Sequence, residues 1–248
     1  MSEHTQEFYV GYLPLAPPGL ARRVRVVVIA LVLVALGLAA LLVTAMSGFG
    51  SGVFEYGVER EFRGVIEAEP YPVLAVERPG DSRSRYLLSA PGKHGARELV
   101  AGFIGKSVRI RGTLVYRESL TMIEIAEVSL APQDSAASMD SRTDLGVVTL
   151  VGEIVDSKCY LGVMKPGNTK AHRDCAVRCI SGGIPPVLLV RDENGNAGYY
   201  LLVGENGESV NRSVLDLVAE PIEVTGALQR VGDQFSLRAD PARYRRLP

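Results

Sequence analysis

The run Pro72-Val73-Leu74-Ala75-Val76 recurs later in the chain as Pro186-Val187-Leu188-Leu189-Val190. The same spacing relates Tyr86-Leu87-Leu88 to Tyr200-Leu201-Leu202. It also relates Gly112-Thr113-Leu114 to Gly226-Ala227-Leu228. Matching apolar segments at one fixed spacing indicate that the chain carries two copies of one structural unit.

Each copy has the same order of predicted elements. In the first copy, alternating apolar residues predict strands at 62–68, 72–77, 85–89, 107–116 and 121–128, with a helix at 96–104. The matching segments of the second copy are 147–155, 186–191, 199–203, 221–228 and 235–239, with 209–219 in the place of the helix. The order β-β-β-α-β-β predicts a mainly β protein of two tandem OB-like five-stranded barrels. The alternative is a pair of small β-sandwiches.

The repeat is interrupted in one place. Upstream of it, Phe62–Glu67 matches Leu150–Val155 at a shorter spacing, so the second copy carries an insertion, about 158–183, between its first two strands. OB folds bind ligands with the loops that join strands one to two and four to five. The insertion is therefore expected at the ligand-binding mouth of the second barrel, faced by the loop Gln229–Gln234.

All three cysteines of the chain lie in this insertion, together with one of its three histidines. Thr169 is expected to cap a short helix that ends at Gly182-Gly183, which would place His172, Cys175 and Cys179 on one helix face. A turn at Pro166-Gly167-Asn168 would bring Cys159 back to them. Three thiolates and one imidazole form a complete tetrahedral set for a zinc or copper ion.

Two further residues can support such a site. Met164 is a candidate soft ligand for Cu(I), and Asp156 is a candidate hydrogen-bond acceptor that orients His172, although capping a turn is the more common role of such an aspartate. The spacing of the four ligands is not that of a standard zinc finger. The insertion is also basic, and we expect its cations to be solvated: Lys158, Lys165, Lys170, Arg173 and Arg178.

Two other interpretations of the cysteines stay open. A disulfide from Cys159 to Cys175 or Cys179 would staple the inserted loop and leave one thiol. Thiol redox catalysis needs a depressed cysteine pKa, which lysine or arginine neighbours can supply, but the chain has no Cys-x-x-Cys motif. We expect a binding protein rather than an enzyme.

The stretch Val26–Met46 carries no charge and is long enough to cross a bilayer. Arg22, Arg23 and Arg25 precede it, and no charge follows until Glu55. By the positive-inside rule, we expect a cytoplasmic tail at 1–21, a transmembrane signal anchor at 22–46, and the rest of the chain outside. A signal peptide cleaved after Ala45 is the rival interpretation.

The remaining boundaries follow from composition. We expect a stalk at 47–53, the first barrel at 54–130, a polar linker at 131–146, the second barrel at 147–241 and a short basic tail at 242–248. The net charge is −1 and there is no tryptophan. Neither property fits a nucleic-acid-binding protein, so we expect no nucleic-acid partner.

The inserted residues have the pattern D-S-x-C…H-x-x-C-A-x-x-C…G-I-P, from Asp156 to Pro185. This pattern resembles the signature of an uncharacterised family of exported, membrane-anchored bacterial proteins. The resemblance implies an exported bacterial setting and no particular activity. Together with the apolar stretch and the arginines before it, this predicts a single-pass protein of the bacterial inner membrane with its barrels in the periplasm. The expected function is metal binding or handling in support of a membrane or periplasmic redox protein complex. The alternatives are a non-catalytic assembly subunit with a disulfide-stapled loop and a thiol-dependent oxidoreductase.

Overall fold

The computed structural model describes residues 16–47, 52–78, 82–132 and 142–248, which form two units, 1–50 and 51–248. The first unit holds the helix α1 (Pro18–Ser47). Within Pro18–Met46, an 18-residue window has a mean hydropathy of 3.3, and none of that window is buried. The helix is thus long and apolar enough to span a membrane, a property that signal sequences share. Most of the expected tail 1–21, the stalk residues 48–51 and the linker residues 133–141 lie outside the described residues.

The first barrel contains five strands: β2 (Arg60–Glu67), β3 (Val73–Arg78), β4 (Ser82–Ser89), β5 (Ser107–Arg117) and β6 (Leu120–Leu130). They pair in the order β5-β2-β3-β4-β6, and the β5–β6 pairing closes the barrel. Only the β4–β6 pair is parallel among these strands. The short strand β1 (Val53–Phe54) adds to β5, and the helical turns α2 (Arg97–Val100) and η2 (Ala101–Phe103) connect β4 to β5.

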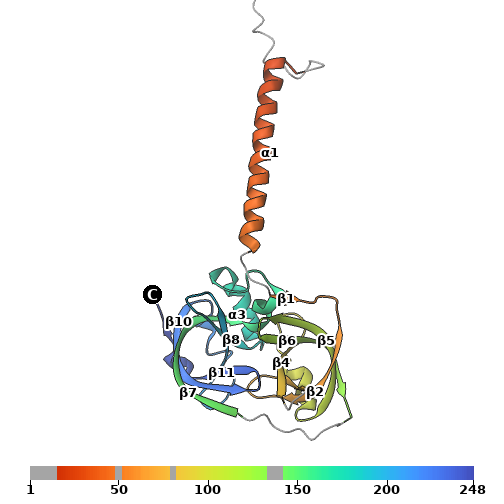
Figure 1. Cartoon of the computed structure of the whole chain (residues 1–248), viewed down its shortest axis with the longest axis vertical. Helices are drawn as coiled ribbons and strands as arrows, with labels where there is room; N and C mark the ends of the chain where they lie inside the picture. The colour runs from red at the N-terminus through yellow and green to blue at the C-terminus, as the bar shows by residue number, and fades with distance from the viewer. Residues whose placement is uncertain (1–15, 48–51, 79–81, 133–141) are drawn as a thin grey trace, which may run out of the picture. The chain divides into compact units, whose positions relative to one another are not determined.

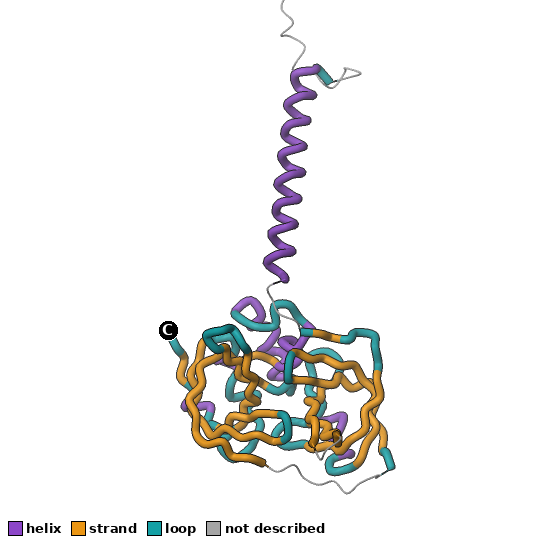
Figure 2. Tube along the Cα trace, viewed as in Figure 1, coloured by secondary structure: helices purple, strands orange, loops and turns teal. Residues whose placement is uncertain are grey.

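The second barrel repeats this topology with β7 (Arg142–Asp156), β8 (Pro186–Arg191), β9 (Ala197–Val203), β10 (Pro221–Val231) and β11 (Gln234–Arg238). The β10–β11 pairing closes it, and β9–β11 is its parallel pair. The two barrels lie side by side in Figures 1 and 2. The predicted pair of OB-like barrels is therefore confirmed, and the sandwich alternative is wrong because both sheets close.

The repeated apolar run has a structural cause. In β3 and β4, Leu74 and Leu88 point into the core of the first barrel, whereas their neighbours Val73 and Leu87 belong to a third core that both barrels share. The second barrel contributes Val187, Leu189, Leu201 and Val203 to this shared core. Strands that are buried on both faces read as continuous apolar runs, so the feature that reveals the repeat also marks the seam between the barrels.

Three expected boundaries are corrected. The linker is shorter than 131–146, because β7 begins at Arg142, which pairs with Val231 of β10. The segment 209–219 forms only a 3₁₀ turn at Leu215–Leu217. The residues of the expected basic tail are tied to the barrel, since β12 (Arg245–Arg246) pairs with β10.

The loop Gln229–Gln234 does not face the insertion. Asp233 accepts a hydrogen bond of 3.0 Å from the backbone N–H of Arg85, and the Gln234 amide donates to the Arg85 carbonyl at 2.9 Å. Gln234 is buried there. The loop is instead a polar contact between the two barrels, and the expectation failed because the sequence does not show how the barrels dock.

Candidate metal centre

The inserted segment lies between β7 and β8, as predicted, and folds as three short helices: η3 (Cys159–Val163), η4 (Lys170–His172) and α3 (Arg173–Ser181). Tyr160 and Leu161 of η3 are buried in the core shared by the two barrels. The insertion is therefore part of the interior of the molecule and not a loop added to its surface.

Asp156 organises the start of the insertion. It is fully buried at the end of β7, and one of its carboxylate oxygens accepts a hydrogen bond of 2.7 Å from the backbone N–H of Cys159. This bond caps the turn that begins there, as aspartate caps a helix. The N–H of Met164 then donates a hydrogen bond of 3.1 Å to the carbonyl of Cys159, which completes the π-helical turn η3. Single π turns are frequent at functional sites.

The predicted reversal at 166–168 packs closely on η3. A Cβ atom on Gly167 would lie only 2.5 Å from the Cα of Tyr160, so a residue without a side chain is required. Glu153 of β7 holds the turn by accepting hydrogen bonds from the Asn168 amide (3.0 Å) and the Thr169 N–H (2.9 Å). The chain therefore turns back toward β7 and delivers the helix α3 beside Cys159.

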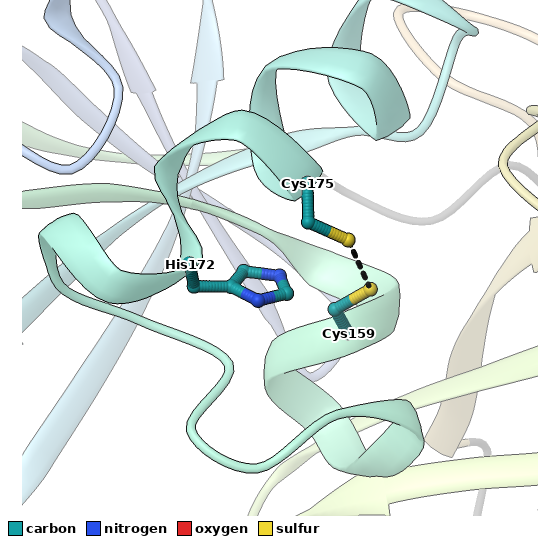
Figure 3. Close-up of side chains that lie close together, drawn as sticks. All are labelled: Cys159, His172 and Cys175. Carbon is teal, nitrogen blue, oxygen red and sulfur yellow. Dashed lines mark hydrogen bonds between the residues drawn. The ribbon is translucent and has the colours of Figure 1, made fainter.

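Thr169 does not cap a helix through its side chain, contrary to prediction. The residue at the N-cap position of α3 is His172, and Cys175 and Cys179 lie one turn apart on that helix, which has Gly182 at its C-cap. Figure 3 shows His172 and Cys175 pointing toward Cys159 across the gap between the helices.

The three sulfur atoms form a compact group. The Sγ atom of Cys159 lies 3.9 Å from that of Cys175 and 3.8 Å from that of Cys179. A disulfide has an S–S bond of about 2.05 Å, so the cysteines are unbridged, and all three are free. Cys159 is the common neighbour of both helix cysteines, as the sequence predicted.

The imidazole of His172 completes the group. A ring nitrogen of His172 and the sulfurs of Cys159 and Cys175 all lie within 4.8 Å of one another. The Nε2 atom lies 3.1 Å from the second carboxylate oxygen of Asp156, which orients the ring. A carboxylate that orients the imidazole is a common partner of a metal-binding histidine. A carboxylate oxygen of Asp156 also lies within 4.8 Å of the sulfurs of Cys159 and Cys179.

These distances suit a metal ion. With metal–sulfur bonds of about 2.3 Å, two sulfurs at corners of a tetrahedron lie about 3.8 Å apart. Cys159, His172 and Cys179 are at most 4% exposed, and Cys175 is half-buried. The buried Cys/His group could therefore hold a metal ion with little movement. Met164, at 44% exposure, does not share this burial, and nothing in its position supports the role of an extra ligand.

Hydrogen bonds and burial shift the pKa values of the group. The hydrogen bond between the thiols of Cys159 and Cys179, together with burial, raises the pKa of Cys159. The same hydrogen bond lowers the pKa of Cys179. The ammonium of Lys93, in the loop after β4, donates a hydrogen bond of 2.7 Å to the Cys175 sulfur, which raises the pKa of Lys93. A metal ion that binds here must displace the thiol protons, so its binding would release protons.

Two lysines have roles that the sequence did not indicate. Lys93 comes from the first barrel, and no local motif connects it to the insertion. Lys158 was expected to be solvated but is 2% exposed, and it donates hydrogen bonds of 2.7 Å to the carbonyls of Ala90 and Gly92 and pairs with Glu124. Arg173 pairs with Glu220 of the second barrel. Only the docking of the two barrels creates the Lys93 and Lys158 contacts.

No model of a known protein family matches the chain, and no curated protein sequence matches it. The candidate centre therefore rests on its own geometry.

Proposed function

We propose that this chain is a membrane-anchored periplasmic protein that binds a soft metal ion, zinc or copper, through Cys159, His172, Cys175 and Cys179. In this role the protein supports a redox system of the bacterial inner membrane or periplasm and is not itself an enzyme. The helix α1 anchors the chain in the membrane, and the arginine cluster in its first turns, ahead of the uncharged stretch, orients the barrels outward.

The observation that carries the proposal is the spacing of the three sulfurs. Cys159 lies 3.9 and 3.8 Å from its two neighbours, which is the separation of thiolates that share a metal ion. The supporting observations are the buried His172 and the Asp156 carboxylate that fixes its ring. Thiolate and imidazole ligands select zinc and Cu(I) over hard cations such as magnesium and calcium.

A second candidate function rests on the same distances. In an oxidising compartment, Cys159 needs only a small movement to form a disulfide with either helix cysteine. The insertion would then be stapled, one thiol would be left over, and the protein would act as an assembly subunit without a metal.

The experiment that separates these functions is metal analysis of the full chain, purified in mild detergent under reducing, oxygen-free conditions and compared with a Cys159→Ser variant. If the protein binds a metal, we expect about one ion per chain in the wild type and none in the variant. The cysteine thiols should react with alkylating reagents only after a chelator has removed the ion. One free thiol, no metal and a disulfide in protein expressed in the periplasm and purified without reductant would favour the assembly subunit. Turnover of a dithiol substrate would favour the thiol oxidoreductase.

A further inference from the structure

The ligands of the candidate metal centre all come from the insertion in the second barrel, but a charged group beside them comes from the first barrel. The Nζ atom of Lys93 lies 2.7 Å from the sulfur of Cys175, the most exposed of the three cysteines. Its ammonium charge also acts on the sulfurs of Cys159 and Cys179. Lys93 is therefore placed to interact with the charge of the whole centre.

The backbone that carries Lys93 is fixed against the insertion. The buried ammonium of Lys158 binds the carbonyls of Ala90 and Gly92, on one side of Lys93. On the other side, the N–H of Gly95 donates a hydrogen bond of 2.9 Å to the carbonyl of Gly182. A Cβ atom on Gly182 would clash with the carbonyl oxygen of Lys93, so the loop after β4 and the end of the insertion touch backbone to backbone.

We propose that Lys93 is a specificity-determining residue, which makes the centre favour a monovalent soft cation such as Cu(I) over divalent zinc. This inference rests on the proposed function and names the class of ion. Lys158 and the Gly95–Gly182 contact are the positioning elements that hold Lys93 at the centre.

The physical reason is the charge that each ion brings. The attraction of the Lys93 ammonium to the thiolates is the same whichever ion is bound. Its repulsion of the ion doubles when the ion carries two charges instead of one. With three thiolates and a neutral imidazole, a monovalent ion leaves the centre with a net charge of about −2 and a divalent ion leaves about −1. The ammonium therefore stabilises the monovalent complex more.

Asp156 is a second charged group that acts on the sulfurs of both Cys159 and Cys179. Asp156 attracts a divalent ion more than a monovalent one, which opposes the effect of Lys93. It is engaged by the Cys159 N–H and by His172, whereas Lys93 makes a direct contact with a ligand sulfur. The preference for a monovalent ion therefore depends on the presence of the Lys93 charge, which a substitution can remove.

The test measures Cu(I) and Zn(II) affinities of the full chain in detergent, by competition with chromophoric chelators, for the wild type and for Lys93→Gln and Lys93→Arg. We expect Lys93→Gln to shift the ratio of the two affinities toward zinc about tenfold, since a charge a few ångströms away at a partly screened position has an effect of that order. Lys93→Arg should keep most of the wild-type ratio. The matched control is Lys106→Gln, an exposed lysine of the first barrel that donates to the Gly102 carbonyl.

The dependence on ionic strength shows whether the effect of Lys93→Gln comes from the lost charge or from altered packing. The shift caused by Lys93→Gln should shrink as the ionic strength rises, because screening weakens the charge of the exposed lysine and leaves packing unaffected. An unchanged ratio in Lys93→Gln, or equal weakening of both ions, would overturn the inference and leave the proposed metal binding intact. A wild-type protein that binds neither ion would overturn both.

Discussion

The ammonium group of Lys158, in the segment inserted into the second barrel, donates a hydrogen bond of 2.7 Å to the carbonyl oxygen of Ala90 in the first barrel. The same ammonium binds the Gly92 carbonyl and the Glu124 carboxylate. The segment that carries the candidate metal ligands thus holds the two barrels together as well.

Replacement of Lys158 by methionine is expected to lower the free energy of unfolding by about 3 kcal/mol, because a buried ion pair that loses one partner leaves the other uncompensated. Urea denaturation of the full chain in detergent measures the change. Lys170→Met is the control, since Lys170 is 75% exposed and its pair with Glu220, at 3.6 Å, contributes less than about 1 kcal/mol. Equal effects of the two substitutions would contradict a structural role for Lys158.

Deletion of 158–183 is expected to disrupt the molecule, although the first barrel folds without such a segment. The deletion removes Tyr160 and Leu161 from the core that both barrels share. The two barrels should then no longer unfold together as one cooperative unit. Calorimetry should then show two transitions, or one broad transition at lower temperature. Shortening the exposed turn Asp192–Asn196 is the control, and a single sharp transition in the deletion variant would show that the insertion does not couple the barrels.

Replacement of His172 by alanine should lower metal affinity at least tenfold, because it removes a proposed ligand. Asp156→Asn should lower the affinity about tenfold, since one amide oxygen replaces two carboxylate oxygens that serve His172 and the Cys159 N–H. Chelator competition measures both affinities. His94→Ala, at an exposed histidine in the same region, should have no effect. An unchanged affinity in His172→Ala would remove that residue from the ligand set.

Tyr71 is expected to make the protein sensitive to alkaline pH. Its hydroxyl donates to the Leu202 carbonyl at 2.8 Å and accepts from the Val210 N–H at 3.2 Å, across the seam of the barrels. Burial raises the pKa of Tyr71. The unfolded phenol ionises near pH 10, at about its ordinary value, and the folded one only at higher pH. The stabilisation is therefore complete below pH 10 and is lost as the pH rises above it.

The corresponding variant is Tyr71→Phe, which should lower the free energy of unfolding by about 1.5 kcal/mol at neutral pH, because the two buried backbone groups lose their partner. It should also reduce the loss of stability above pH 10. Unfolding curves at a series of pH values test both effects, with Tyr56→Phe, at an 84% exposed tyrosine, as the control. An undiminished alkaline slope in Tyr71→Phe would assign the sensitivity to other groups.

The membrane orientation can be tested with reporters fused after Pro248. Alkaline phosphatase, which is active only outside the cytoplasm, should be active in the fusion, and a cytoplasm-specific reporter should be inactive. Neutralising Arg22, Arg23 and Arg25 with glutamine should weaken this orientation, because the charge bias ahead of the uncharged stretch sets it. The opposite reporter pattern would place the barrels in the cytoplasm.

The sequence alone determined the elements that depend on local pattern. Its repeated apolar runs, Gly and Pro positions and strand alternation defined both barrels, because strand periodicity and turn residues act over a few residues. The uncharged stretch Val26–Met46 defined the apolar helix in the same way. The meeting of Cys159 with Cys175 and Cys179 was also predictable, since a helix repeat and one turn are enough to bring them together.

Only the tertiary structure decided how the barrels dock and what the docking does to the insertion. Tyr160 and Leu161 read as loop residues but lie in the shared core, and Lys158 reads as a solvated cation but is buried. Lys93 reaches Cys175 from the other barrel, far away in the sequence. Contacts of this kind leave no periodic signal, because each depends on the relative placement of two folded surfaces and not on the residues next to it in the chain.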